Sequence, residues 1–354
     1  MKHLKIILPA VFIILVLVGS LLFRLPEEIL VRFEPVTSSK PDYGALPVVV
    51  VNDERIFTLF AALNAAGFDD EYSGMAMHPV RQKIREVLGS RSISNRKELK
   101  DYFQKAATYH LVNWTLQRGS APEFNRAEPG WWVTMNAAPF YQLDQNLAAF
   151  YQEADLAGLW KLVEKDYQAA VAIWQPAANQ SLLRIKNYTG LTQLPFKQVV
   201  IIPNLLDSHY SGYGPQIGDT AYVIAGPTDS IENLTGLMEH EMLHSMIGPL
   251  LDQNSTIVKT TVKNELYKTL KTTMPSSYGS WNSVLEESLI RAINLRMIAD
   301  EDIRNQQISR LVDEGFLLIP VFNDALNDYE QSKQTLDSYL PLLLKRLETV
   351  QLNQ

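Results

Sequence analysis

Apolar residues recur every three or four positions along most of the chain, which is the spacing of an amphipathic helix. This helical pattern dominates between about residues 53 and 185, where Gly and Pro interrupt it. The clearest helical segments in that part are 54–67, 79–89, 95–116 and 156–175. Further helices are predicted at 230–247, 257–272, 283–299, 302–314 and in the leucine-rich end after Tyr329. The pattern predicts a predominantly helical protein.

Three short runs are rich in β-branched residues and predict strands instead. They are Pro47–Asp53, residues 197–204 (KQVVIIPN) and residues 219–226 (DTAYVIAG). A loop rich in Gly, Tyr and Ser separates the second run from the third. Few strands among many helices predict an α+β fold with one small β-sheet. The expected domain is 46–354, with a helical half (53–185), a sheet and its following helices (197–300) and C-terminal helices (301–354).

An uncharged apolar run covers residues 6–23, which is about the length that crosses a bilayer. Lys2 and Lys5 precede it, and the positive-inside rule keeps them in the cytoplasm. A cleaved signal peptide is the alternative, with a poor cleavage site at Val18–Ser20. We favour a retained single-pass transmembrane helix.

The anchor or signal sequence then occupies residues 1–24, and a linker with three prolines occupies 25–45. In both cases the domain that follows is expected outside the cytoplasm, in the periplasm or at the cell exterior. It would be secreted if the N-terminal segment were removed.

Composition limits the chemistry that this domain can carry out. The 354 residues are 46% hydrophobic and 20% charged, as in folded proteins. A net charge of −7 without a basic cluster argues against nucleic acid as the partner. The chain has no cysteine, which excludes disulfides, cysteine nucleophiles and cysteine metal sites. Any bound metal must therefore be held by His and carboxylate groups.

Residues 240–244 read His-Glu-Met-Leu-His within a predicted helix. Thr228, Asp229 or Ser230 can cap the start of this helix, and Gly248 with Pro249 is expected to end it. Side chains four apart share one helix face, so both imidazoles can reach one metal ion. Glu241 would point beside that metal, where it can accept a proton from a water molecule. The structural alternative is a helix that carries two unrelated histidines.

The third ligand should be a carboxylate, because no histidine follows His244. Glu286 and Glu287 are adjacent in a later helix. Ser283 and Glu286 fit a capping box, which gives Glu286 a structural role. Glu287 lies four before Arg291, whose guanidinium can fix the geometry of a ligating carboxylate. We favour Glu287 over Glu286 as the ligand; a plain surface ion pair of Glu287 with Arg291 is the structural alternative.

A His-Glu-x-x-His helix followed by a helical Glu resembles the gluzincin branch of zinc metallopeptidases. The fuller pattern resembles a family of bacterial envelope proteins known only as a domain of unknown function and suspected to be such peptidases. Its shared features are the helix that ends at Pro249, then Met274, Tyr278, Trp281 and the sequence EESLIRA.

This resemblance covers about residues 45–300 and implies a zincin-like fold. It also implies that Zn²⁺ is held by His240, His244 and Glu287, with Glu241 as the general base. The usual gluzincin has an acidic residue four positions after the ligating Glu, where this chain has Arg291.

Two further roles are open at this point. An extended substrate could pair with the edge of the sheet, and residues 219–226 are well placed for that, although an ordinary strand is the alternative. His209, Tyr210 and Tyr213 could stabilise an oxyanion, with Tyr278 as an equal contender.

The sequence therefore favours a membrane-anchored, extracytoplasmic zinc metallopeptidase. It would hydrolyse peptide bonds of a peptide or protein substrate with a zinc-activated water and Glu241 as the general base. The alternatives are a non-catalytic envelope scaffold or structural metal-site protein, and a metal-dependent amidase that acts on a non-peptide substrate.

Overall fold

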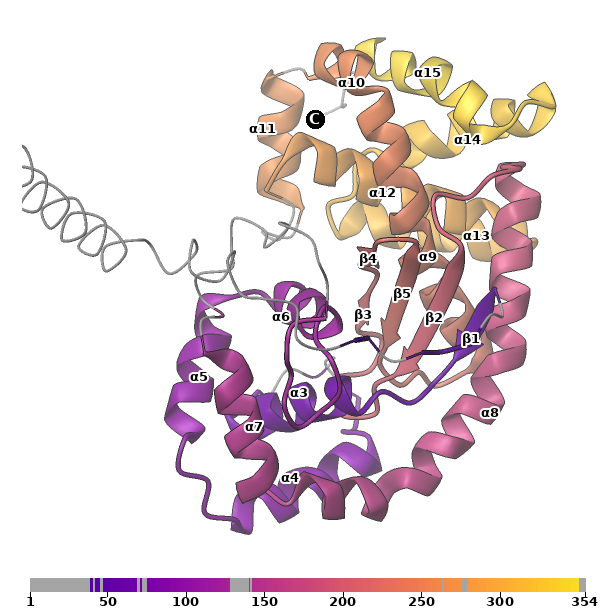
Figure 1. Ribbon diagram of the computed structural model, residues 1–354. Coiled ribbons are helices and arrows are strands. Elements are labelled where there is room, and N and C mark those ends of the chain that lie inside the picture. Colours follow the sequence, from indigo (N-terminus) through magenta and orange to yellow (C-terminus); the bar gives the residue numbers. More distant parts are fainter. Residues whose placement is uncertain are drawn as a thin grey trace, which may run out of the picture. The chain divides into compact units, whose positions relative to one another are not determined.

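Five strands form one small mixed sheet in the computed structural model, which describes residues 39–349 apart from 41, 45–46, 69–70, 72–74, 128–139, 141, 263 and 275–278. The parallel strands are β1 (Val48–Val50), β2 (Gln198–Pro203) and β5 (Thr220–Ala225) (Figure 1). Strands β3 (Gly212–Tyr213) and β4 (Gln216–Ile217) are antiparallel to β5. The prediction of an α+β fold, mostly helical with one small sheet, is confirmed.

Burial explains why the two longest strands have continuous apolar sequences. Residues 199–203 of β2 and 221–225 of β5 are all buried. Their register pairs Val199 with Ala221 and Ile202 with Ile224. Parallel strands that are covered on both faces need apolar residues at every position, rather than at every second one.

Of the two roles left open for residues 219–226, the structure shows the ordinary strand, because they do not lie at the edge of the sheet. The order of strands is β1-β2-β5-β3, and β4 also pairs with β5, so β5 is internal. The loop before β5 turns back on it as a short hairpin. Gly218 has a φ of +59° at this turn, a conformation that glycine adopts without strain. Strands of two residues are too short to show an alternating pattern, which is why the sequence did not reveal them.

The chain forms two compact units, each built from several segments of the sequence. Unit 1 contains Glu54–Asp69 and Lys83–Leu162, and unit 2 contains Tyr43–Asp53, Asp70–Gln82 and Val163–Gln354. In unit 1, helix α3 (Glu54–Ala65) is almost wholly buried and packs against three other helices. These are α5 (Arg96–Lys105), α6 (Thr108–Leu116) and α7 (Leu143–Glu153).

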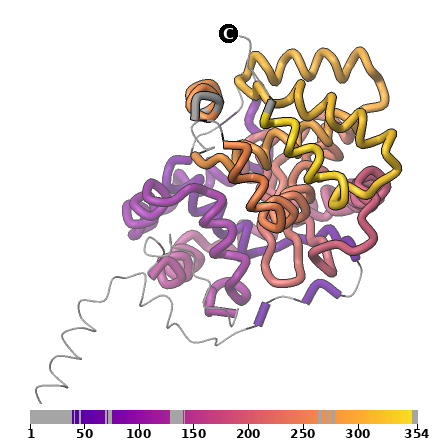
Figure 2. The backbone as a smooth tube through the Cα atoms, turned by 90° about the horizontal axis from the view of Figure 1, so that it is seen from above, coloured from indigo at the N-terminus to yellow at the C-terminus, as the bar shows by residue number. Residues whose placement is uncertain are grey.

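Unit 2 contains the whole sheet and the helices that follow it. The helix of the His-Glu-x-x-His motif, α9 (Ile231–Gln253), packs against β5 and against α12 (Trp281–Arg296). Helix α12 also packs against α14 (Ile319–Ser332), which lies beside α15 (Leu336–Arg346) (Figure 2). The remaining helical elements of unit 2 are α10 (Ser255–Thr261), α11 (Asn264–Thr273), α13 (Glu301–Asp313) and η2 (Leu347–Thr349).

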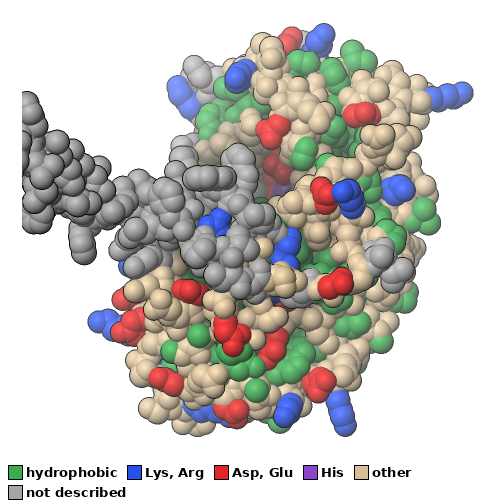
Figure 3. Space-filling model, viewed as in Figure 1, with side chains coloured by type: hydrophobic (Ala, Val, Ile, Leu, Met, Phe, Trp, Pro, Cys, Tyr) green, Lys and Arg blue, Asp and Glu red, His purple; other side chains and the backbone are tan. Residues whose placement is uncertain are grey.

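Two helices contribute to both units, namely α4 (Pro79–Ser90) and the much longer α8 (Leu156–Thr189). Within unit 2, α8 borders β1, where the Gln175 side chain accepts a hydrogen bond from Val50 N at 2.8 Å. On the face drawn in Figure 3, charged side chains of both signs are interspersed among the described residues.

Several predicted helix boundaries are wrong. Helix α9 does not end at Gly248 and Pro249 but continues to Gln253. Proline removes one N–H donor from the helix, but Leu250 and Leu251 extend its buried face, and this packing outweighs the loss. The predicted segment 257–272 is divided into α10 and α11, and 95–116 into α5 and α6.

None of the helices in the described part of the chain has the length and apolar character of a membrane span. The predicted transmembrane run at residues 6–23 lies outside the described residues.

Candidate metal centre

Helix α9 begins where a side-chain cap was predicted. Of the three candidates, Ser230 is the N-cap, and its hydroxyl accepts a hydrogen bond from Asn233 N at 3.1 Å. One side of the helix is anchored by buried apolar residues: Leu234, Met238, Met242, Leu243, Met246 and Ile247. The histidines therefore project from a helix that is fixed by its own packing.

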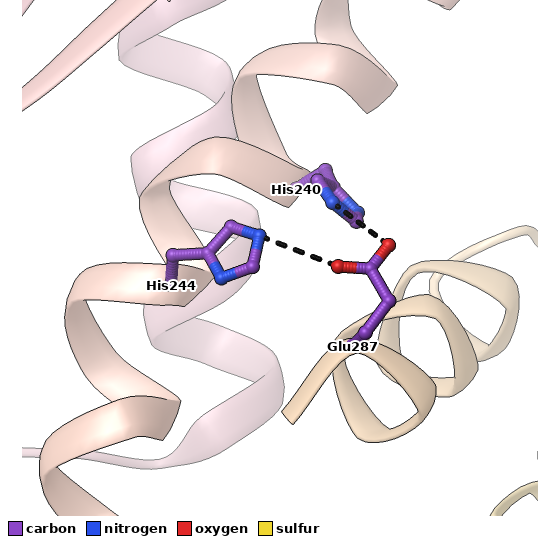
Figure 4. Close-up of side chains that lie close together, drawn as sticks. All are labelled: His240, His244 and Glu287. Atoms are coloured by element: carbon purple, nitrogen blue, oxygen red, sulfur yellow. Dashed lines mark ion pairs between the residues drawn. The ribbon is translucent and has the colours of Figure 1, made fainter. Parts of the chain in front are cut away.

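Two helices distant in sequence bring His240, His244 and Glu287 together (Figure 4). Nε2 of His240 lies 3.5 Å from Oε1 of Glu287, and Nε2 of His244 lies 3.7 Å from Oε2. One ligand atom from each residue can be chosen so that all three lie within 4.8 Å of one another. The Glu287 carboxylate faces both imidazoles, so this group could hold a metal ion.

The protonation of His240 suits a metal ligand. Burial lowers the pKa of His240 to about 3, although the nearby Glu287 carboxylate opposes this change. The imidazole is therefore neutral at physiological pH and keeps a lone pair for coordination.

The predicted capping role of Glu286 is wrong. Ser280 caps α12, and its hydroxyl and that of Ser283 bond reciprocally to the backbone N–H groups of the two residues. Because the helix starts one turn earlier than expected, Glu286 lies in its second turn, where it reaches Nδ1 of His244 at 2.8 Å. Burial opposes a charge on His244, but this hydrogen bond and the surrounding carboxylates outweigh burial and raise its pKa.

The expected contact between Glu287 and Arg291 is present. Nη2 of Arg291 lies 2.6 Å from Oε1 of Glu287. The guanidinium carbon of Arg291 also lies over the ring of Phe316, 4.4 Å from its centroid, in a cation–π contact. Glu287 is only 3% exposed, so a neighbouring cation offsets the cost of burying its charge.

Glu241 points toward the edge of the sheet. A Cβ added at Gly212 in β3 would lie 2.4 Å from Oε1 of Glu241. A Cβ added at Gly214 would lie 2.4 Å from the carbonyl oxygen of the same residue. The chain between 212 and 214 can approach Glu241 only because both positions are glycine. Burial raises the pKa of Glu241 to about 7.

A second ion pair connects α9 to a neighbouring helix, next to the histidines. Glu239 is 2% exposed, and its Oε1 lies 3.3 Å from Nη1 of Arg184 on α8. Arg184 also donates to the carbonyl of Met297, at the end of α12, at 2.8 Å. The guanidinium therefore links α8, α9 and α12, the last two of which carry His240, His244 and Glu287. Burial raises the pKa of Glu239 to about 7, although Arg184 opposes this.

The residues considered for an oxyanion role have other contacts. Nδ1 of His209 lies 4.0 Å from Oε2 of Glu71, and Tyr210 accepts a hydrogen bond from Asn233 Nδ2 at 3.5 Å. Tyr213 lies on β3 and hydrogen-bonds to Asp207. Tyr278 lies outside the described residues.

Four residues near this group were not singled out by the sequence analysis or were given another role. Gly212 and Gly214 were visible as a Gly-x-Gly in the loop before β5, but only the fold shows what they touch. Glu286 was assigned to a helix cap, and no local sequence pattern marked Asp207 as part of the site.

Residues 217–346 match the model of DUF4932, a domain of unknown function. The match includes α9 and α12, and with them His240, His244 and Glu287. It begins later than the resemblance predicted from residue 45, and it extends into the helices after residue 300 that the resemblance did not place. Neither the curated proteins nor the solved structures contain a match to this chain.

Proposed function

We propose that this protein is a zinc-dependent peptidase with a gluzincin-type site. The observation that carries the proposal is the convergence of His240 and His244 from one helix with Glu287 from another. Glu241 interacts electrostatically with His244 and Glu287. Two imidazoles and one carboxylate form the ligand set of a catalytic zinc, which keeps a fourth position open.

The separations between these atoms fit zinc. Bonds of about 2.0–2.1 Å in a tetrahedral arrangement place the ligand atoms roughly 3.4 Å apart. The two nitrogen-to-oxygen distances of 3.5 and 3.7 Å, each to a different oxygen of Glu287, are close to that value, and with one ligand atom per residue all three atoms lie within 4.8 Å of one another. An ion bound there supplies a Lewis acid that polarises a carbonyl and acidifies water.

The side chains around the site then have distinct roles. Glu241 takes a proton from the attacking water and delivers it to the leaving amine. Glu286 accepts the Nδ1 proton of His244, which leaves the Nε2 lone pair directed at the metal position. Arg291 holds the Glu287 carboxylate in its orientation.

Replacing Glu241 tests this mechanism directly. Glu241→Gln should abolish hydrolysis of casein and of a mixed quenched-fluorescence peptide library, while one zinc per chain is retained. His240→Ala should lose the zinc as well. The matched control is Glu232→Gln, which changes an exposed glutamate in the first turn of the same helix and should leave both properties unchanged. Activity in Glu241→Gln would contradict the mechanism, and a wild-type chain without stoichiometric zinc would favour a scaffold.

We further propose that the enzyme acts outside the cytoplasm on a membrane anchor. The support is the apolar run at 6–23 behind Lys2 and Lys5. The full chain should remain in the membrane fraction after a high-salt wash, and protease added from the extracytoplasmic side should digest the domain. Recovery of the domain in the cytoplasm would contradict this location.

A further inference from the structure

The loop between β2 and β3 folds around a carboxylate that is fully removed from solvent. Asp207 is 0% exposed, and so is Asn204, whose backbone N–H is bonded to Ala225 at the end of β5. The Asp207 carboxylate accepts the backbone N–H of Ser208 at 2.8 Å and the side-chain amide of Asn204 at 3.4 Å.

The same carboxylate also reaches the edge strand. The hydroxyls of Ser211 and Tyr213 both hydrogen-bond to Asp207. These two residues flank Gly212 in the sequence. Ser211 is tied further to its surroundings, because its Oγ lies 3.0 Å from Ser208 O and its carbonyl accepts Gly226 N at 2.8 Å.

Gly212 is the point at which this strand touches Glu241. The space that a Cβ would occupy there is within 2.4 Å of Oε1 of Glu241 and within 2.8 Å of its Cδ. Any displacement of β3 therefore changes the room that is available to the Glu241 carboxylate.

The chemistry of the loop calls for an acid at position 207. The backbone N–H of Ser208, the side-chain amide of Asn204 and the hydroxyl of Tyr213 face this side chain as donors, and the Ser211 hydroxyl, which also donates to Ser208 O, lies beside it. An ionised carboxylate is acceptor-only, with about four lone-pair sites. An asparagine has the same shape, but its NH₂ group would face two of these donors and leave them without an acceptor. Burying a carboxylate is costly, so its presence here requires a compensating role.

We propose that Asp207 is a positioning residue that holds β3 against Glu241 and so fixes the orientation of the catalytic carboxylate. The inference rests on the proposed function in that it takes Glu241 to be the general base. The charged and titratable groups that face Asp207 are Arg81 in the first turn of α4, Tyr167 on α8 and Tyr213 on β3. Arg81 is itself fully buried and pairs with Glu71 at 2.5 Å.

Hydrogen–deuterium exchange and kinetics of the full chain test this proposal together. In Asp207→Asn, amides of residues 211–217 should exchange roughly tenfold faster or more, as expected when buried hydrogen bonds are lost. Exchange in α12 and the zinc content should not change. On the substrate that the wild type cleaves best, kcat should fall about tenfold to a hundredfold with KM unchanged, because a base is misplaced and no binding contact is lost.

The matched control is Asp219→Asn, which changes an exposed acid on the same hairpin whose side chain pairs with Lys197. It should leave exchange and kcat unchanged. Ser211→Ala serves as a second variant should Asp207→Asn not fold, and it should loosen residues 211–217 in the same direction.

The two proposals fail in different ways. Unchanged exchange at 211–217 and unchanged kcat in both loop variants would overturn the role of Asp207, while an active wild type would leave the peptidase proposal standing. Faster exchange in the loop variants supports the role of Asp207 in holding β3 even if the wild type cleaves no substrate. The absence of cleavage by the wild type would overturn the peptidase proposal alone.

Discussion

At the scale of single residues, one hydrogen bond decides which nitrogen of His244 faces the metal position. Glu286 holds Nδ1 at 2.8 Å, so Nε2 is directed at Glu287. Carboxylates in this position fix the tautomer of a ligating histidine, and their loss typically lowers metal affinity 10- to 100-fold. We expect Glu286→Ala to lower zinc affinity by about this factor, measured by competition with a chromophoric chelator.

Glu286→Gln should have a smaller effect, because its amide oxygen can still accept the Nδ1 proton. Glu301→Ala, at an exposed glutamate in the first turn of α13, is the control and should bind zinc as the wild type does. Equal affinities in Glu286→Ala and the control would show that the tautomer is set by another group.

A second prediction concerns the stability of the fold as a function of pH. Burial raises the pKa of Asp207 to about 6 from an ordinary value of 3.8, with hydrogen bonds and Arg81 opposing the rise. The folded chain therefore binds this proton more tightly than the unfolded chain does. The resulting stabilisation is fully present below pH 3.8 and is lost as the pH rises through about 6. At about 1.4 kcal/mol per pKa unit, the total loss amounts to about 3 kcal/mol.

Asp207→Asn cannot titrate, so the comparison isolates this effect. The difference in free energy of unfolding, wild type minus variant, should fall by about 3 kcal/mol between pH 3.5 and pH 7 in urea titrations. A constant difference in stability between the two proteins does not affect how this free-energy difference changes with pH. A difference that stays flat would mean that Asp207 keeps its ordinary pKa in the fold, and one that rises with pH would mean that its pKa is lowered there.

The sequence was informative about residues whose partners lie one helical turn away. His240 with His244, and Glu287 with Arg291, follow from a spacing of four, and the structure places both pairs side by side. The contact of Glu286 with His244 spans 42 positions and leaves no local pattern. The sequence also made Ser283 a plausible N-cap of α12. No local feature distinguishes Ser283 from Ser280, which is the N-cap in the structure.

At the scale of elements, the approach of β3 to α9 depends on glycine. In Gly212→Ala the new Cβ would meet the end of the Glu241 side chain and Cδ1 of Leu237, and both are flexible side-chain ends that can rotate away. The fold should therefore tolerate the change while the carboxylate loses its position. We expect hydrolysis to fall by about a hundredfold with zinc content and unfolding midpoint close to those of the wild type.

Two further glycines serve as comparisons for this variant. Gly236→Ala lies in α9 with no heavy atom within 4 Å of the new Cβ, so it should keep activity and gain up to about 1 kcal/mol of stability. Gly214→Ala would meet the backbone of Glu241 instead and should destabilise the fold. Full activity in Gly212→Ala would argue that Glu241 works from another orientation.

The elements themselves were predictable where burial imposes a long, regular pattern. Strands β2 and β5 and helix α12 could be found from apolar runs and periodicity because each is covered by the rest of unit 2. The hairpin of β3 and β4 could not, because it is made by backbone pairing to β5 through residues without a pattern. The extension of α9 through Pro249 likewise depends on what Leu250 and Leu251 pack against, which the local sequence does not state.

At the scale of the whole molecule, the three proposed metal ligands His240, His244 and Glu287 all belong to unit 2. A ligand that binds only the folded state stabilises it by RT ln(1 + [L]/Kd), which is about 2.7 kcal/mol at a hundredfold excess over Kd. Zinc bound as we propose would join α9 to α12, so this stabilisation should act within unit 2. We expect zinc to raise the Tm of that unit by roughly 5–10 °C relative to a chelator-treated sample.

Exchange measured peptide by peptide separates the two units. With zinc, protection should increase in α9 and α12, whereas α3 and α5 of unit 1 should change little. The free energy of zinc binding can slow exchange in unit 1 only if both units unfold together. His240→Ala should remove the effect. His110→Ala, at a histidine on α6 of unit 1, should retain it, which excludes adventitious zinc on any histidine. Equal gains in protection for both units would instead mean that the chain unfolds as one cooperative body, and that the boundary between them has no thermodynamic meaning.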